Sequence, residues 1–219
     1  MNALELVTAV IVAASPAPAE VLGKVQASYR QAGDIEARFT QTYVDKLRGK
    51  RREESGRMWA KKDGRLNWTY EKPAAKYFIF DGKAAYFYEP ENAQVTVFER
   101  FQDSPLSSAV RFLWGQGDIG RLFDAKACQA SCDAGSPGDL TVDLWPKTPI
   151  PTVDHILFAV EPKTGRVRVS VVFDPLGNRT EYRFTDLVFG AKIPDQKLEF
   201  EAPKGVSILR ATSGSDANP

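Results

Sequence analysis

The stretch from Leu66 to Glu89, LNWTYEKPAAKYFIFDGKAAYFYE, decides the fold class of this chain. It alternates runs of aromatic and β-branched residues with short turns, and Asp81-Gly82 is a strong hairpin signal. We expect strands over 66–71, 76–80 and 84–89. Consecutive strands joined by tight turns indicate an antiparallel sheet.

The same pattern continues in both directions along the chain. Upstream, apolar and polar residues alternate from Ile35 to Thr40, and a strand over 56–61 precedes the Asp63-Gly64 turn. Downstream, further strands are predicted over 94–100, 140–145, 153–161, 166–174, 179–187 and, briefly, around 198–200. The sequence therefore predicts roughly ten strands.

Two segments have helical rather than β periodicity. Apolar residues recur at helical spacing from Glu20 to Ala32, before Gly33. A second helix is predicted over 104–114, and a further turn or two follows Asp118. We predict a mainly β, α+β fold: a highly curved antiparallel sheet or open barrel, with an N-terminal helix and mid-chain helices at its mouth.

Composition bounds the organisation and the possible partners. The 219 residues are 43% hydrophobic, and 29 Lys and Arg against 28 Asp and Glu give a net charge of +1, so nothing points to nucleic acid. We expect one domain over 20–211, a disordered tail over 212–219 and a monomer. The charge run from Lys46 to Glu54 is interpreted as a solvated hairpin loop, with a docking patch for an acidic partner as the alternative.

The N-terminus and the two cysteines indicate in which cellular compartment the protein works. Residues 1–19 resemble a secretory leader, with small residues at Ala17 and Ala19 before Glu20, although no Lys or Arg opens it. A short helix or a tail is the other interpretation. In an exported protein, Cys128 and Cys132 most simply form a disulfide. Two free thiols, or a metal site, are the alternatives.

No motif predicts catalysis. The single histidine, His155, lies in a predicted strand, where alternation would point the side chain of Asp154 to the opposite face. Phosphate-loop, nucleophile-elbow and zinc-helix patterns do not occur in the sequence. We therefore predict that the chain is not an enzyme and binds neither metal nor cofactor.

The aromatic residues say more about function than the catalytic motifs do. Neighbouring predicted strands carry large apolar side chains at consecutive positions, which point to both faces of the sheet. Plain core packing explains this, and so does an apolar hollow. Such a hollow suits acyl chains, since burial of each CH₂ stabilises by about 0.8 kcal/mol. The candidates for lining and lid are Trp59, Trp68, Phe78, Phe80, Tyr86, Tyr88, Leu106, Val110 and Leu113.

Several strings in the right order resemble the periplasmic outer-membrane lipoprotein carrier family (LolA). They run from about Glu20 to Leu209 and are IEARFTQ at 35–41, GRMWAKK at 56–62, LNWTY at 66–70, AYFYEP at 85–90, FTDL at 184–187, IPD at 193–195 and FEAPKGV at 200–206. No single string is specific, but the ordered set is.

The resemblance implies an incomplete antiparallel barrel with helices as a lid, and a carrier that catalyses nothing. It implies acylated lipoproteins as cargo, an inner-membrane ATP-driven transporter as donor, and an outer-membrane receptor as acceptor, in the periplasm. A carrier of another acylated product, or a lipoprotein-sensing interaction module on the same fold, is the alternative.

One departure from the family concerns lid closure. Many members have Arg-Pro after the Trp-x-Lys element, and that Arg helps to hold the lid closed. Here Lys62 and Asp63 stand at the matching positions. Lysine lacks the planar donor fork of arginine, so we expect a more weakly closed lid, or closure by another residue such as Arg65.

Overall fold

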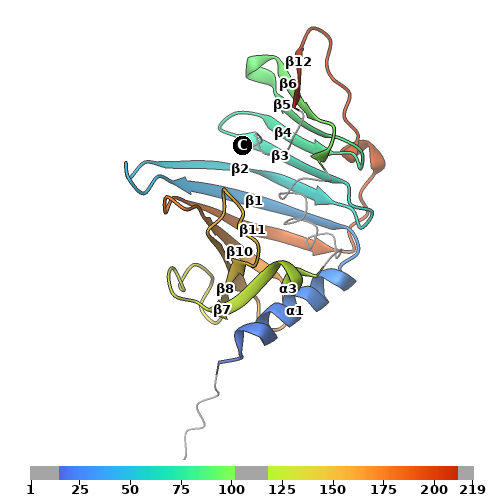
Figure 1. The fold of residues 1–219 in the computed structure, drawn as a ribbon. Helices are drawn as coiled ribbons and strands as arrows, with labels where there is room; N and C mark the ends of the chain where they lie inside the picture. Colours follow the sequence, from blue (N-terminus) through green and yellow to red (C-terminus); the bar gives the residue numbers. More distant parts are fainter. Residues whose placement is uncertain (1–14, 102–117, 212–219) are drawn as a thin grey trace, which may run out of the picture.

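The computed structural model describes residues 15–101 and 118–211, and its main feature is one large sheet with helices beside it (Figure 1). Its helical elements are α1 (Pro18–Gln31), α3 (Ile119–Leu122), and the 3₁₀ helices η1 (Pro90–Asn92) and η4 (Asp195–Leu198). Within these ranges, no helix is long and apolar enough to cross a membrane.

Twelve strands form the sheet. They are β1 (Ile35–Val44), β2 (Arg51–Ala60), β3 (Leu66–Lys72), β4 (Lys76–Phe80), β5 (Ala85–Glu89), β6 (Gln94–Phe98), β7 (Phe123–Ala127), β8 (Leu140–Pro146), β9 (His155–Val160), β10 (Val167–Phe173), β11 (Arg179–Phe189) and β12 (Ser207–Ala211). Their spatial order is β12-β6-β5-β4-β3-β2-β1-β11-β10-β9-β8-β7, so β12 and β7 are edges and the sheet does not close into a barrel.

All neighbouring strands pair antiparallel except β12, which runs parallel to β6. The long hairpin of β1 and β2 lies at the centre, and β11 pairs with the other side of β1. The predicted mainly β fold with an antiparallel sheet and an N-terminal helix is confirmed.

The inner face of the sheet is the face that carries Phe39 and α1. Helix α1 directs Val21, Val25 and Tyr29 at this face, where it packs beside β7 and β8. The ring of Tyr29 meets that of Phe189 at 5.2 Å. These contacts explain the periodicity of the segment, because the apolar stripe of the helix needs a partner surface.

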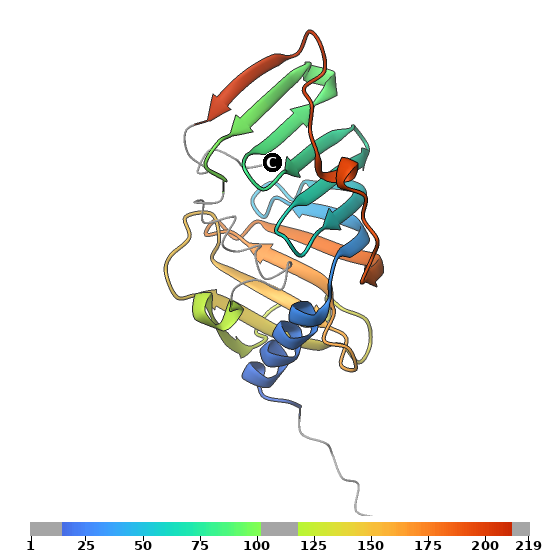
Figure 2. The same ribbon diagram turned by 90° about the vertical axis from the view of Figure 1, so that its right-hand side faces the viewer.

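The outer face, on the other side, is covered by two irregular segments. Residues 190–206 run along the outer side of the upper strands (Figure 2), where Ile193 and Leu198 pack against Trp59. Residues 128–139 cover β9 and β10, with Ala134 over Leu157. The predicted disulfide between Cys128 and Cys132 is present in this second segment.

The structure corrects several element predictions. The hairpin loop expected over 46–54 is shorter, because residues 51–54 belong to β2, where Glu54 is buried. Phe123 was expected in the helical turn after Asp118, but it begins strand β7, which pairs with β8. The strand expected near 198–200 is the 3₁₀ helix η4, and the last strand is β12, whose backbone finds partners on β6. The helix expected over 104–114 lies outside the described residues, as do its candidates Leu106, Val110 and Leu113.

Candidate functional site

The inner face carries a continuous aromatic surface across β1, β3, β4 and β11. Trp68 lies at its centre, with its ring 4.9 Å from that of Phe39 and 6.1 Å from that of Phe184. Phe78 and Phe80 continue the surface, and each ring packs on Phe101 at 5.3 and 5.2 Å. Trp68 and Phe78 remain partly exposed although they pack against the buried core.

Strand register explains which residues meet on this face. Phe78 pairs with Trp68 on one side and with Phe87 on the other, so all three side chains point the same way. Phe87 is also partly exposed, and it was not among the residues that the sequence analysis selected. The pairing of residues across the β4–β5 hairpin, which sets Phe87 opposite Phe78, is the signal that identifies Phe87.

Three of the predicted lining residues lie on the outer face instead. Trp59 pairs with Asn67 and packs under the 190–206 segment. Tyr86 and Tyr88 pair with Ile79 and Tyr77, and their rings lie 4.9 and 5.8 Å from that of Phe200. Tyr86 also borders an outer groove of about 300 Å³. These three residues therefore do not share a surface with Trp68 and Phe78.

A polar cluster bounds the aromatic surface toward the free end of the β1–β2 hairpin. The Tyr70 hydroxyl donates to Gln41 Oε1 at 2.6 Å, and Lys76 Nζ donates to Glu54 Oε1 at 2.6 Å. Gln41, Glu54 and Tyr70 are buried. Burial, and then the nearby Glu54 carboxylate, raises the pKa of Tyr182 to about 12. The inner face thus has an apolar middle and a polar end.

Trp68 also carries a polar group, its indole N–H. It is shielded from solvent and has no hydrogen-bond partner among the described residues. A buried donor without an acceptor costs about 1–3 kcal/mol. A ligand carbonyl would remove that cost once the groups that shield this N–H move aside.

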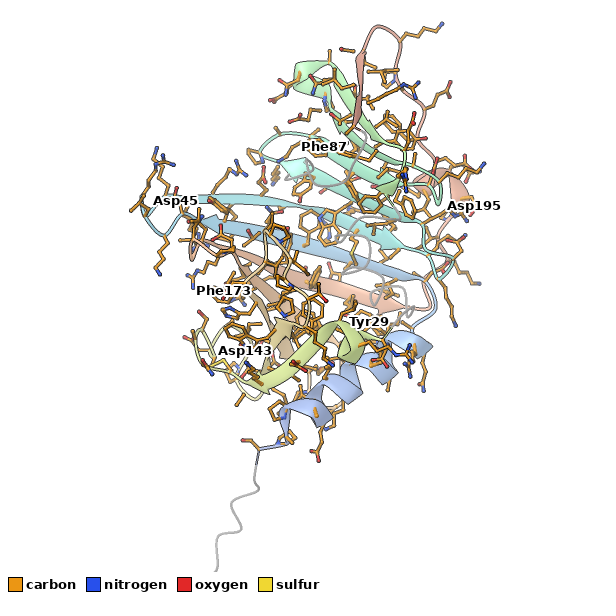
Figure 3. All side chains as sticks on the ribbon, viewed as in Figure 1. Tyr29, Asp45, Phe87, Asp143, Phe173 and Asp195 are labelled. Atoms are coloured by element: carbon orange, nitrogen blue, oxygen red, sulfur yellow. A yellow bond between two sulfur atoms is a disulfide. The ribbon has the colours of Figure 1, made fainter. Side chains whose placement is uncertain are left out.

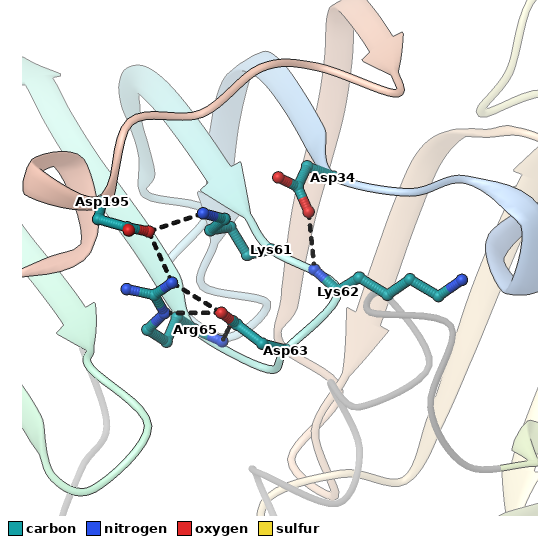
Figure 4. Close-up of polar contacts among 6 residues, drawn as sticks. All are labelled: Asp34, Lys61, Lys62, Asp63, Arg65 and Asp195. Atoms are coloured by element: carbon teal, nitrogen blue, oxygen red, sulfur yellow. Dashed lines mark hydrogen bonds and ion pairs between the residues drawn. The ribbon is translucent and has the colours of Figure 1, made fainter.

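Lys62 and Arg65, the two lid-closing candidates, differ in their contacts (Figure 4). Arg65 donates to Asp63 Oδ2 through Nε at 2.9 Å and to Asp195 Oδ1 through Nη2 at 2.7 Å. Lys62 donates its backbone N–H to Asp34 Oδ1 at 3.0 Å, and its side chain extends away from Asp195.

Arg65 belongs to a clasp of Lys61, Asp63, Arg65 and Asp195. Lys61 Nζ donates to the same Asp195 oxygen as Arg65, at 2.7 Å. The bonds from Lys61 and then from Arg65 lower the pKa of Asp195 below its usual range. The clasp therefore fastens η4, and with it the 190–206 segment, to the β2–β3 turn.

A second groove, of about 560 Å³, lies between α1 and β7 and was not predicted. Leu22, Gln26, Ile119 and Phe123 are among its lining residues. Gln26 Oε1 accepts from the N–H of Ile119 at 2.8 Å, which joins α1 to α3. No three His, Cys, Asp or Glu side chains gather into a metal-binding group in 15–101 or 118–211.

His155 lies on the outer face, stacked between Trp145 at 4.7 Å and Phe173 at 4.3 Å. The expectation that Asp154 points away from it is wrong, because Asp154 Oδ2 lies 2.8 Å from His155 Nδ1. Asp154 precedes β9, so the alternation of strand side chains does not apply to it.

Comparison with known proteins assigns the family. The sequence profile of the outer membrane lipoprotein carrier protein LolA matches residues 30–201. The chain belongs to the LolA family. It is 31% identical over 192 residues to the outer-membrane lipoprotein carrier protein of Nitrosospira multiformis, covering 86% of this chain and 87% of that protein. The Chromobacterium violaceum carrier is 30% identical over 199 residues, with 90% of each chain covered.

Structural comparison shows the shared fold. An uncharacterized conserved protein from Thermus thermophilus superposes with a TM-score of 0.54 at 13% identity, covering 88% of this chain and 98% of the other. As a member of the LolA family, the chain is a lipoprotein carrier protein and not an enzyme. The family prediction made from the ordered strings is thereby confirmed.

Proposed function

We propose that this LolA-family protein takes acylated lipoproteins from an inner-membrane ATP-driven transporter, shields their acyl chains, and delivers them to an outer-membrane receptor. The observation that carries the proposal is the aromatic surface of Trp68, Phe78 and Phe87, which stays partly exposed on the inner face. An acyl chain laid over these rings exchanges water for apolar contacts and gains about 0.8 kcal/mol per CH₂ buried.

Ester and amide carbonyls link the acyl chains to the cargo, and they need hydrogen-bond donors at the edge of the apolar surface. We propose that the Trp68 N–H donates to one of these carbonyls. The polar cluster around Tyr70 and Lys76 then faces the peptide that follows the lipidated residue. The family match favours a lipoprotein over another acylated product as the cargo.

We place the carrier in the periplasm and propose residues 1–19 as its export leader. The Cys128–Cys132 disulfide supports this location, since disulfides persist in oxidising compartments. Mass spectrometry of the protein recovered from the periplasm of an expressing cell tests it. The expected product is a mature chain that begins at Glu20. A protein that keeps residues 1–19 and stays in the cytoplasm contradicts the proposal.

The carrier role is tested with membrane vesicles that hold labelled lipoprotein, the transporter and ATP. We expect labelled lipoprotein to appear in the soluble fraction as a one-to-one complex, only when both ATP and this protein are present. Serum albumin at equal concentration controls for nonspecific extraction. Absence of release from an active transporter contradicts the proposal.

A further inference from the structure

Two neighbouring hairpin tips each present an almost fully exposed leucine. Leu47, in the turn between β1 and β2, is 92% exposed, and Leu176, in the turn between β10 and β11, is 81% exposed. The β1–β2 hairpin projects beyond the rest of the sheet (Figure 1). Because β1 pairs with β11, the two turns lie side by side, and the N–H of Lys46 donates to Asn178 Oδ1 at 3.0 Å.

Both turns are held in place by hydrogen bonds of their first residue. Asp45 Oδ1 accepts from the N–H of Arg48 at 2.8 Å, and its backbone pairs with Lys50. Asp174 Oδ1 accepts from the N–H groups of Leu176 and Asn178, at 2.9 and 2.8 Å. Figure 3 marks Asp45 at the far end of the hairpin, on the opposite side of the molecule from Asp195. The leucines therefore sit on ordered turns.

The β1–β2 tip also carries a local excess of positive charge. Residues 45–53 hold five Lys and Arg side chains and two carboxylates, a net charge of +3, whereas the whole 219-residue chain has +1. Residues 46–53 are all exposed. Arg48 and Arg51 pair with Asp45 and Glu53 at 3.3 and 3.2 Å, and both arginine side chains are open to solvent. Lys46 and Lys50 add charge on both sides of Leu47.

We propose that the two tips, residues 45–52 and 174–179, form a surface that docks the protein onto anionic lipid bilayers. Leu47 and Leu176 enter the boundary between headgroups and acyl chains, and the surrounding cations meet the lipid phosphates. A protein partner fits less well, because stable protein interfaces cover about 800 Å² per partner, whereas these are two narrow, projecting turns. The docking would hold the carrier at a membrane during transfer.

Vesicle binding without cargo tests the proposal, and its result does not depend on whether the protein carries lipoproteins. The vesicles contain phosphatidylcholine alone or phosphatidylcholine with about 30 mol% phosphatidylglycerol. We expect flotation with the anionic vesicles only, weakened severalfold by a rise in salt from about 50 to about 300 mM. Leu47→Ser and Leu176→Ser each lower the partition coefficient about tenfold.

Leu122→Ser is the matched control, because Leu122 is an exposed leucine elsewhere, at 40%, and it should leave the partition unchanged. Leu47→Trp gives a second measurement, a blue shift of fluorescence on anionic vesicles. Failure of the wild-type protein to bind these vesicles overturns the proposal, as does equal binding of Leu47→Ser with an unchanged melting temperature. If tip variants then still slow transfer between protein partners, the tips contact an acidic protein instead.

Discussion

Trp68 combines a large apolar ring on the inner face with a buried N–H that has no acceptor among the residues described. The ring packs against Phe39 and Tyr182, at 4.9 and 5.6 Å. Packing and hydrogen bonding can therefore be separated at this residue by removing the donor and keeping an aromatic side chain.

Trp68→Phe should weaken the binding of a diacylated, fluorescent lipopeptide by up to about tenfold, the value of one net hydrogen bond. The free energy of unfolding without cargo should fall by no more than about 1 kcal/mol, because removal of the unpaired buried N–H offsets the packing loss of a smaller ring. Fluorescence titration and urea unfolding measure the two effects. Unchanged affinity would show that the N–H meets no cargo carbonyl.

Lys62 and Arg65 stay the two lid-closing candidates, and the Arg65 guanidinium is bonded to Asp63 and Asp195. We predict that Lys62→Ala lowers the yield of transporter-driven lipoprotein release severalfold. Arg65→Ala, as the comparison, should lower the melting temperature instead. If release by Lys62→Ala equals the wild type, Lys62 is a solvated turn residue.

At the scale of single elements, the hairpins decide how much of the site could be read from the sequence. The turns and strands were predictable from Asp81-Gly82 and Asp63-Gly64, because such dipeptides need turn geometry. The faces depend on the number of loop residues. Phe80 pairs with Ala85 across a four-residue loop, so residues of opposite parity share a face, and Phe87 joins Phe78 whereas Tyr86 does not.

The β2–β3 turn shows why loop length could not be read reliably. The N–H of Lys61 donates to the carbonyl of Arg65, and Gly64 has a φ of +100°, as in a three-residue loop with a glycine in the left-handed region. A strand expected to end at Lys61 and resume at Leu66 has one loop residue more. That single residue moves Trp59 to the other face relative to Trp68.

The clasp at Asp195 should make the 190–206 segment sensitive to acid. The pKa of Asp195 is lowered by Lys61 and then by Arg65. The stabilisation that the clasp gives is therefore present above the usual carboxyl pKa and is lost as the pH falls through the lowered value. We expect faster amide exchange in 190–206 below about pH 4. Asp195→Asn should show the faster exchange already at about pH 7.

Hydrogen exchange with mass spectrometry, corrected for intrinsic rates, measures this opening. Asp45→Asn is the control, because the N–H of Arg48 likewise lowers the pKa of Asp45, but in the distant hairpin. That variant should leave exchange in 190–206 unchanged. If Asp195→Asn protects the 190–206 amides from exchange as well as the wild type does at neutral pH, apolar packing of Ile193 and Leu198 holds the segment without the clasp.

The disulfide segment should tolerate loss of its cross-link. Ala134 packs over Leu157, and Arg183 Nη2 donates to the Ala134 carbonyl at 2.7 Å. Since Cys128 and Cys132 close a short loop, Cys128→Ser with Cys132→Ser should destabilise by about 2 kcal/mol in the chain-entropy account. Urea unfolding with and without reductant measures it. A wild-type stability that reductant leaves unchanged would contradict this account of the disulfide.

At the scale of the whole molecule, the open sheet separates two faces that differ in what covers them. The outer face is covered by residues 128–139 and 190–206, and the inner face keeps a partly exposed aromatic surface beside α1. Element order and family were predictable because local patterns determine them. The division of aromatic residues between the faces depends on register across distant strands, and the candidate lid at 104–114 lies outside the described residues.

Photocrosslinking from adjacent residues of β5 tests the central claim that cargo acyl chains lie on the inner face. A photoreactive phenylalanine analogue replaces Phe87 on the inner face or Tyr88 on the outer face, and the transporter then loads each protein with labelled lipoprotein. The account predicts crosslinks to lipoprotein from Phe87 and none from Tyr88. Crosslinks from the Tyr88 position alone, in a protein that still releases lipoprotein, would contradict it.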